Sequence, residues 1–151
     1  MTADPETIWR DHAPAALRYA TVLVGPHDAH DVTVNAFLRI SQSPGWANVE
    51  HPRSYLMRAV TNHARDHRRQ QERRWRRDLN AIGPSIATID EPGVDVRREI
   101  ARLSLPQRAV IFLAYWEDMT VPAIADLLGL STGTVQRNLT RARAQLRKAL
   151  R

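Results

Sequence analysis

The chain has 151 residues, enough for one ordinary domain or two small ones, and 43% of them are hydrophobic, as in globular proteins. Its net charge of +6, with 21 arginines and one lysine, favours an anionic partner such as nucleic acid or an acidic protein. The absence of cysteine excludes disulfides, thiol nucleophiles and cysteine-based zinc sites. The sequence shows neither a signal peptide nor a membrane-length apolar run, so we expect a cytoplasmic protein with no membrane insertion.

Two helices are predicted at the start of the chain. Residues 5–24 carry apolar residues at helical spacing, and Pro14 either divides this helix or lies near its start. Gly25 ends the segment, since glycine commonly terminates helices. Residues 28–41 form the second predicted helix, with Asp28 as a candidate N-cap.

The second predicted helix is apolar on more than one side. Its main apolar face holds Val32, Ala36 and Ile40, but Val34 and Leu38 form a further i,i+4 pair away from that face. A helix that is apolar nearly all round is either deeply buried or meets a partner. The sequence leaves both alternatives open.

A third, long helical pattern follows Pro52 and leads into RDHRRQQERRWRR (residues 65–77), where seven of thirteen residues are arginine. Arginines neutralise phosphates and aromatic rings stack on bases, so this surface suits single-stranded nucleic acid. The alternative is a solvated helix end with Trp75 tucked against its own domain. His63 and His67 have the spacing of two zinc ligands, but the zinc-protease Glu is absent and nearby arginines repel cations, so no metal site is expected.

Residues 78–96 are predicted to be a flexible linker, because they contain Gly-Pro and Pro-Gly breaks and four acidic residues. They separate a first unit, residues 1–77, from a second unit, residues 97–151. The predicted fold class is therefore all-α, with two small helical domains joined by the linker.

The second unit carries the pattern of a helix-turn-helix. The apolar run 109–116 fits a buried strand or a helix on periodicity alone, but its surroundings favour a helix. Thr120 is a candidate N-cap, Gly129 makes the turn, and Ser131 caps the next helix.

The last predicted helix has the character of a DNA recognition helix, whose first residues meet base edges in the major groove. The alternative is a polar, solvated face on an ordinary helical hairpin. Amide and guanidinium groups suit bases, and arginines further along suit phosphates. The candidate DNA-contacting residues are Ser131, Thr132, Gly133, Thr134, Gln136, Arg137, Asn138, Arg141 and Arg143.

No catalytic constellation accompanies these features. Asp66 and His67 are adjacent, but no nucleophile or phosphate-binding glycine loop lies near them in the sequence. We therefore expect no catalytic residues, no cofactor and no enzymatic activity.

Three segments together resemble one known family, the extracytoplasmic-function sigma factors of bacterial RNA polymerase. LRYATVLVGPHDAHDVTVNAFLRI resembles the polymerase-binding segment, and PRSYLMRAVTNHARDHRRQQERR resembles the promoter-melting segment. LSLPQRAVIFLAYWEDMTVPAIADLLGLSTGTVQRNLTRARAQLR is similar to the domain that binds the upstream promoter element. The resemblance covers nearly the whole chain except the linker.

The resemblance implies a non-enzymatic role in transcription initiation, with core RNA polymerase and promoter DNA as partners and an anti-sigma protein as a further candidate. Residues 1–77 would be sigma domain 2, which binds the polymerase clamp and captures a base of the melted minus-ten element. Residues 97–151 would be sigma domain 4, which reads the minus-thirty-five element as a duplex. The implied minus-ten residues are Arg53, Tyr55, Arg58, Asn62, Arg65, Asp66, Arg69 and Arg73, and the implied polymerase-binding residues are Asp31, Val34, Asn35, Leu38 and Arg39.

The sequence departs from the family pattern at two places. The clamp-binding helix reads Asp-Val-Thr-Val-Asn from Asp31, where the family usually has Asp-Leu-Val-Gln-Glu, so Val34 would replace a polar contact with an apolar one. Gln136 and Arg137 replace the usual Lys-Ser pair, which should alter the preferred upstream sequence.

Two other function classes compete with this interpretation. A stand-alone helix-turn-helix repressor or activator would bind duplex DNA without polymerase. An RNA-binding protein or a nuclease is a third alternative, and a nuclease would need a carboxylate cluster at a metal site, which the sequence does not show.

Overall fold

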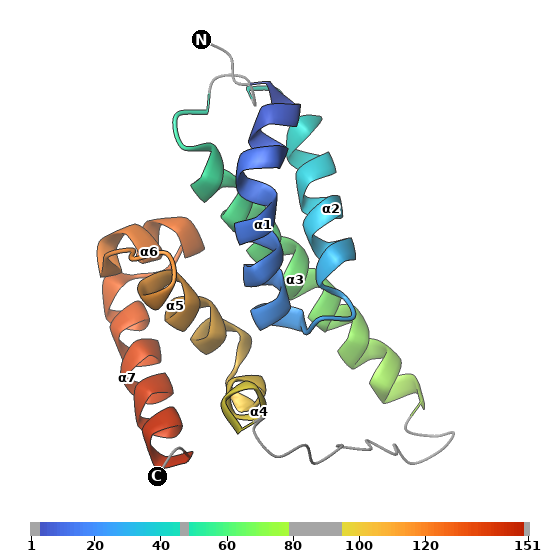
Figure 1. Ribbon diagram of the computed structural model, residues 1–151. Helices are drawn as coiled ribbons and strands as arrows, with labels where there is room; N and C mark the ends of the chain where they lie inside the picture. Colours follow the sequence, from blue (N-terminus) through green and yellow to red (C-terminus); the bar gives the residue numbers. More distant parts are fainter. Residues whose placement is uncertain (1–3, 46–48, 79–94, 150–151) are drawn as a thin grey trace.

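The computed structural model describes residues 4–45, 49–78 and 95–149, and within these ranges all regular structure is helical (Figure 1). This confirms the predicted all-α class. No helix in the described ranges is long and apolar enough to cross a membrane. In chain order the helices are α1 (Pro5–Val24), α2 (Ala29–Ser41), α3 (Pro52–Asp78), α4 (Asp95–Arg102), α5 (Leu105–Tyr115), α6 (Val121–Leu128) and α7 (Thr132–Ala149).

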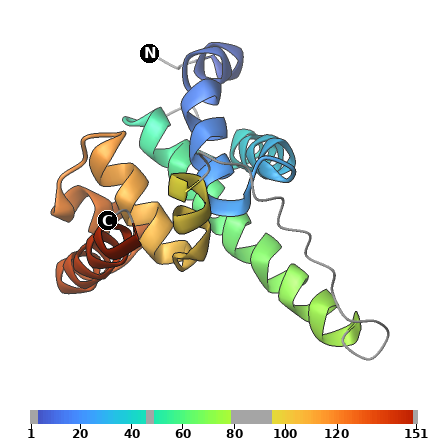
Figure 2. The same ribbon diagram turned by 60° about the horizontal axis from the view of Figure 1, so that its bottom comes forward.

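Helices α1, α2 and α3 pack on one another as a bundle, and the last turns of α3 extend beyond the other helices (Figures 1 and 2). Helix α1 runs unbroken through Pro14, which settles the alternatives left open by the sequence. Proline removes one backbone hydrogen bond from the helix. The burial of Ala15, Ala16 and Ala20 stabilises α1 and so offsets that loss. Gly25, at φ +88°, ends α1 as predicted.

Asp28 does not cap α2 with its side chain, although α2 begins one residue later. Its backbone has helical angles instead of the extended angles of a capping residue, so the carboxylate points elsewhere. It accepts a hydrogen bond from Gln71 Nε2 at 3.3 Å and lies 3.1 Å from His67 Nε2. Asp28 therefore ties the start of α2 to the arginine-rich part of α3.

The ends of the predicted linker, residues 78–96, are helical. Helix α3 continues through Asp78 and α4 begins at Asp95, whereas residues 79–94 lie outside the described residues. Helix α4 was not predicted, although Val96, Ile100 and Leu103 have the i,i+4,i+7 spacing of a helix face.

N-capping side chains begin α5 and α6 of the second unit. Ser104 and Gln107 form a reciprocal capping box at α5, so the apolar run beginning at Ala109 is helical and not a strand. Thr120 caps α6 by accepting from the Ala123 amide at 3.3 Å, as predicted. These caps fix where each short helix begins.

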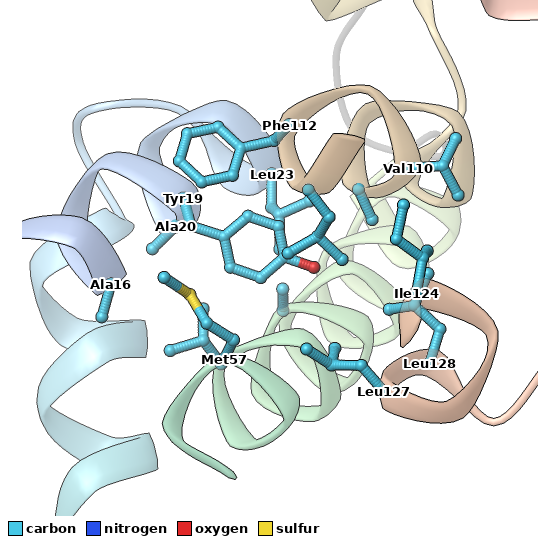
Figure 3. Close-up of a cluster of buried hydrophobic side chains, with 14 of the residues drawn as sticks. Ala16, Tyr19, Ala20, Leu23, Met57, Val110, Phe112, Ile124, Leu127 and Leu128 are labelled. Atoms are coloured by element: carbon cyan, nitrogen blue, oxygen red, sulfur yellow. The ribbon is translucent and has the colours of Figure 1, made fainter. Parts of the chain in front are cut away.

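The two units share one continuous apolar core (Figure 3). The ring of Tyr19 on α1 lies 5.1 Å from the ring of Phe112 on α5, and α6 packs against α3. The Tyr19 hydroxyl is fully buried and 2.7 Å from Thr61 Oγ1 on α3. Burial raises the pKa of Tyr19 well above its usual range, so the phenol stays neutral.

We expect Tyr19→Phe to lower the free energy of unfolding by about 1 kcal/mol, because it removes a buried hydrogen bond while keeping the ring. Urea denaturation of the whole chain measures this. Tyr115→Phe is the matched control, since it also removes a hydroxyl hydrogen bond, the one from Arg143, but at a residue that is 53% exposed, where the loss should change stability by less than about 0.5 kcal/mol. Equal effects of the two variants would contradict the buried bond's role.

Candidate nucleic-acid interface

Helices α6 and α7 form the predicted helix-turn-helix. Gly129 adopts the left-handed conformation at φ +66°, which glycine reaches without strain, and so turns the chain after α6. Ser131 Oγ accepts from the Thr134 amide at 3.1 Å and thereby caps α7, as predicted. The buried Val135, Leu139 and Ala142 hold one side of α7 on the domain, which leaves its other side outward.

The outward side of α7 carries all the candidate DNA-contacting residues predicted there. Arg137 donates to Thr134 Oγ1 at 3.2 Å, and Thr134 in turn bonds Ser131, so this chain of contacts orients the guanidinium. Apart from the backbone of its own helix, the nearest described atom to a Cβ built at Gly133 is Ser131 Oγ at 4.0 Å, so the surrounding side chains leave room for a larger residue there. The exposed or half-exposed members are Ser131, Thr132, Gly133, Thr134, Gln136, Arg137, Asn138, Arg141 and Arg143.

Arg143 differs from the other members because a side chain of another helix, Tyr115 of α5, holds it. Its Nε donates to the Tyr115 hydroxyl at 2.5 Å, and its guanidinium lies 5.5 Å from the centre of that ring. This contact draws Arg143 toward the end of α5.

A second candidate site is a cavity of about 450 Å³ between α2 and α3. Four arginines, an aspartate and an asparagine give it a mainly cationic wall with hydrogen-bonding groups. Six of the eight predicted minus-ten residues line it, together with Arg39 from the predicted polymerase-binding set. The lining residues are Arg39, Ile40, Ser43, Tyr55, Arg58, Ala59, Asn62, His63, Arg65, Asp66 and Arg69.

His63 was not predicted as a site residue, yet it lines this cavity. Burial lowers its pKa, the positive charge of Arg39 lowers it further, and Asp66 acts in the opposite direction. The imidazole is therefore neutral at pH 7. The sequence did contain an indication of this role for His63. It follows Asn62 directly and lies four residues after Ala59, so helix geometry places it at the edge of the α3 face that meets α2.

The two histidines that were considered as zinc ligands, His63 and His67, have different neighbours. His67 faces Asp28, while His63 faces the cavity. Within the described ranges, no group of three or more histidine, aspartate or glutamate side chains is placed to hold a metal ion.

The predicted polymerase-binding residues form a stripe on the outer side of α2. Leu38 is 48% exposed and Val34 is half-buried, so burial does not account for the second apolar pair of this helix. Asp31 and Asn35 lie beside them on the surface. Single exposed leucines are common on protein surfaces, so the role of this stripe in polymerase binding stays a prediction.

Arg53 and Arg58, both from the predicted minus-ten set, are engaged by the second unit. Arg53 forms a two-point ion pair with Glu117, at 2.7 and 2.8 Å. Arg58 donates to the backbone carbonyls of Leu127 and Asp126 at 3.1 and 2.7 Å. The remaining member outside the cavity, Arg73, is exposed on the extended end of α3.

The basic end of α3 is open to solvent. Trp75 is 46% exposed, so it is not tucked fully against its own domain as one alternative held. Arg68 and Glu72 form an exposed i,i+4 pair, and Arg69 lies 4.0 Å from Asp66. Arg73, Arg74, Arg76 and Arg77 are exposed, and none of them forms an ion pair with another residue that the structure describes.

Two family models match the chain in the order of its two units. Residues 8–74 match sigma-70 region 2, and residues 94–146 match sigma-70, region 4. The first match contains the cavity between α2 and α3, and the second contains the helix-turn-helix.

Several curated bacterial proteins are similar over most of the chain. The RNA polymerase sigma-E factor of Streptomyces coelicolor is 32% identical, covering 93% of this chain and 82% of that protein. The ECF RNA polymerase sigma factor SigL of Mycobacterium tuberculosis is also 32% identical, covering 95% and 86%. SigW of Bacillus subtilis, an ECF RNA polymerase sigma factor, is 26% identical over 83% of this chain and 76% of that protein.

Two solved structures share the fold. The sigma factor RpoE from Bartonella quintana, crystallised with the anti-sigma factor NepR, superposes with a TM-score of 0.78 at 19% identity, covering 96% of this chain and 95% of that one. CnrH, in complex with the cytosolic domain of CnrY, gives 0.60 at 22% identity, covering 97% and 86%. Since both sigma-70 regions are present in order and relatives are 32% identical over more than nine-tenths of the chain, the protein belongs to the sigma-70 family, in its extracytoplasmic-function group.

Proposed function

We propose that this sigma factor directs promoter-specific initiation by dividing promoter recognition between the cavity of α2 and α3 and the outward side of α7. The observation that carries the proposal is the cavity, because it brings Asn62, Asp66 and four arginines together on one side of the first unit. A stand-alone helix-turn-helix regulator needs no such cavity and no sigma-70 region 2, so that alternative is not favoured.

The cavity suits one unstacked base with its flanking phosphates. An extruded base needs a pocket with hydrogen-bonding groups for its edge, which Asn62, Asp66 and the neutral His63 offer. The surrounding arginines and the basic end of α3 would support the backbone of the separated strand. The melted minus-ten element is the strand that fits.

The outward side of α7 suits duplex DNA in the major groove. Arg137 is already oriented by one hydrogen bond to Thr134, and a guanidinium group can pair with guanine through two donors. Gln136 offers an amide that pairs with adenine. These two side chains would set the upstream preference.

The stripe on α2 would bind the clamp of core polymerase, with Leu38 as its apolar anchor. In this role the sigma factor supplies binding and DNA opening, whereas the polymerase carries out the catalytic chemistry. The chain would act in the cytoplasm, where polymerase and promoters meet, and an anti-sigma protein is a further expected partner.

In-vitro transcription tests the function as a whole. The purified chain is added to core polymerase on a pool of promoter fragments, and the transcript starts are sequenced. We expect discrete starts that share two spaced upstream motifs. Tight duplex binding by the chain alone, with no starts, would instead support the stand-alone regulator.

Arg137→Ala should weaken binding to the upstream duplex by about 1–3 kcal/mol and relax the preference at one base pair. The measurement is a titration of the chain with duplexes that vary at each position. Arg147→Ala removes the same charge from the last turn of α7 and should weaken binding to all duplexes equally. An unchanged base preference in Arg137→Ala would exclude a base contact.

Asn62→Ala should lower discrimination at one position of the minus-ten element by about 1–3 kcal/mol, because the captured base loses a hydrogen-bonding partner. Open-complex formation on a promoter set varied at each minus-ten position measures this. Gln70→Ala is the control, since Gln70 is exposed on the same helix and does not line the cavity. Identical profiles for both variants would argue against base capture there.

Leu38→Ala should weaken core-polymerase binding by more than about 1 kcal/mol, since it truncates the apolar anchor of the stripe. A competition assay against a labelled sigma factor gives the affinity. Val96 is 50% exposed on α4, outside the segment that resembles the polymerase-binding region, so Val96→Ala serves as the control truncation of an exposed apolar side chain. If both variants compete as well as the parent chain, Leu38 lies outside the interface.

A further inference from the structure

Tyr115, the last residue of α5, lies outside the helix-turn-helix but bonds a candidate DNA-contacting residue of α7. Helices α5 and α7 pack against each other (Figure 1). Arg143 Nε donates to the Tyr115 hydroxyl at 2.5 Å, and the guanidinium lies 5.5 Å from the centre of the ring. Both residues are exposed, so this contact stands at the surface of the second unit, where DNA could reach it.

Arg143 lies where α7 would meet the DNA backbone and not the bases. A helix rises about 1.5 Å per residue, so Arg143 is about 16 Å along the axis from Thr132, whereas the major groove is about 8.5 Å deep. A helix that enters the groove with its first turn therefore leaves Arg143 near the phosphates at the edge of the groove. Arg143 follows Gln136 by seven residues, close to two turns, so both lie on the same side of α7.

The bond to Tyr115 leaves the outer edge of the Arg143 guanidinium open. A guanidinium carries five N–H donors, one on Nε and two on each Nη. The hydroxyl takes the Nε donor, and among the described residues Arg143 makes no other hydrogen bond and no ion pair. The two Nη groups can therefore bind a phosphate through two parallel hydrogen bonds.

Tyr115 restrains Arg143 without neutralising it. An arginine side chain that is free in solution loses rotamer freedom when it binds, and this loss weakens binding. The hydroxyl and the ring of Tyr115 restrict the guanidinium before DNA arrives. A phenol is a neutral acceptor, so the positive charge of Arg143 stays available, whereas a carboxylate such as that of Glu117 on Arg53 compensates the charge it holds.

We propose that Tyr115 is a positioning residue for upstream-element binding, which orients Arg143 so that its two Nη groups bind one phosphate at the edge of the major groove. The inference rests on the proposed function, because it takes α7 as the helix that enters the groove. It adds a residue of α5 to the upstream site, and it gives Arg143 a role different from the base contact of Arg137.

The salt dependence of duplex binding by the full chain tests the phosphate contact. Each phosphate contact contributes about 0.9 to the slope of log affinity against log salt concentration. Arg143→Ala should therefore reduce the size of that slope by about 0.9 and leave the base preference unchanged, in contrast to Arg137→Ala. An unreduced slope would show that Arg143 meets no phosphate and would overturn the proposal.

A double-mutant cycle tests the positioning. Tyr115→Phe removes the hydroxyl but keeps the ring, and it should lower duplex affinity by about two- to tenfold, the usual effect of ordering one long side chain. Because this variant should barely change stability, such a loss is not caused by unfolding. In the Arg143→Ala background, Tyr115→Phe should change the affinity by less than about 1.5-fold. No loss in the parent chain, or an equal loss in both backgrounds, would overturn the positioning role.

Trp116→Phe is the control for a change at the exposed end of α5. Trp116 is 61% exposed, and its ring stacks on Phe112 of α5 with ring centres 5.9 Å apart. This variant should leave both the duplex affinity and the salt dependence unchanged. If it lowers the affinity as much as Tyr115→Phe does, the effect belongs to the end of α5 in general, and the specific role of Tyr115 is rejected.

The outcomes separate the inference from the function on which it rests. A parent chain that gives no discrete transcript starts with core polymerase would remove the proposed function, whatever Arg143 binds. A parent chain that initiates at discrete promoters, but loses the same affinity from Tyr115→Phe in both backgrounds, would overturn the positioning role alone. A loss that disappears in the Arg143→Ala background, together with the reduced salt dependence of that variant, supports the inference.

Discussion

The buried side chain of Tyr19 makes the contact on which the arrangement of both units depends. Its hydroxyl bonds Thr61 on α3, and its ring lies against Phe112 on α5, so one residue of α1 meets both the first bundle and the second unit. A fully buried phenol without a partner would be costly, and the bond to Thr61 avoids that cost. The apolar contacts around Tyr19 and Phe112 hold the two units together and so determine which of their polar groups meet.

The same property, a surplus of guanidinium groups, serves several purposes in this protein. On the free end of α3 and on α7 the arginines stay solvated and can attract phosphates over a distance. Where the two units meet, three arginines instead donate hydrogen bonds to the neighbouring unit. Arg53 bonds the carboxylate of Glu117, and Arg58 and Arg108 bond backbone carbonyls. Since guanidinium binds carbonyl, carboxylate and phosphate oxygens alike, one residue type can support both a closed protein and a DNA complex.

Parts of the candidate site could be predicted from the sequence because they depend on local rules. Thr120, Gly129 and Ser131 mark the helix-turn-helix through capping and a left-handed turn, which involve only neighbouring residues. Asn62 and Asp66 lie four residues apart on one helix face, so their joint presence in the cavity follows from helix geometry. The prediction that Asp28 caps α2 was wrong for the opposite reason. Its carboxylate instead contacts Gln71 and His67, about forty positions further along the chain.

The sequence by itself determined the all-helical class, the family, the order of the two regions and the helix that carries the candidate DNA-contacting residues, because periodicity, caps and motifs act over short distances. Only the tertiary structure decided that the two units share a core and that Glu117 meets Arg53. The Arg53–Glu117 pair, for example, joins residues 64 positions apart. Both features depend on how whole helix faces pack, which no local pattern specifies.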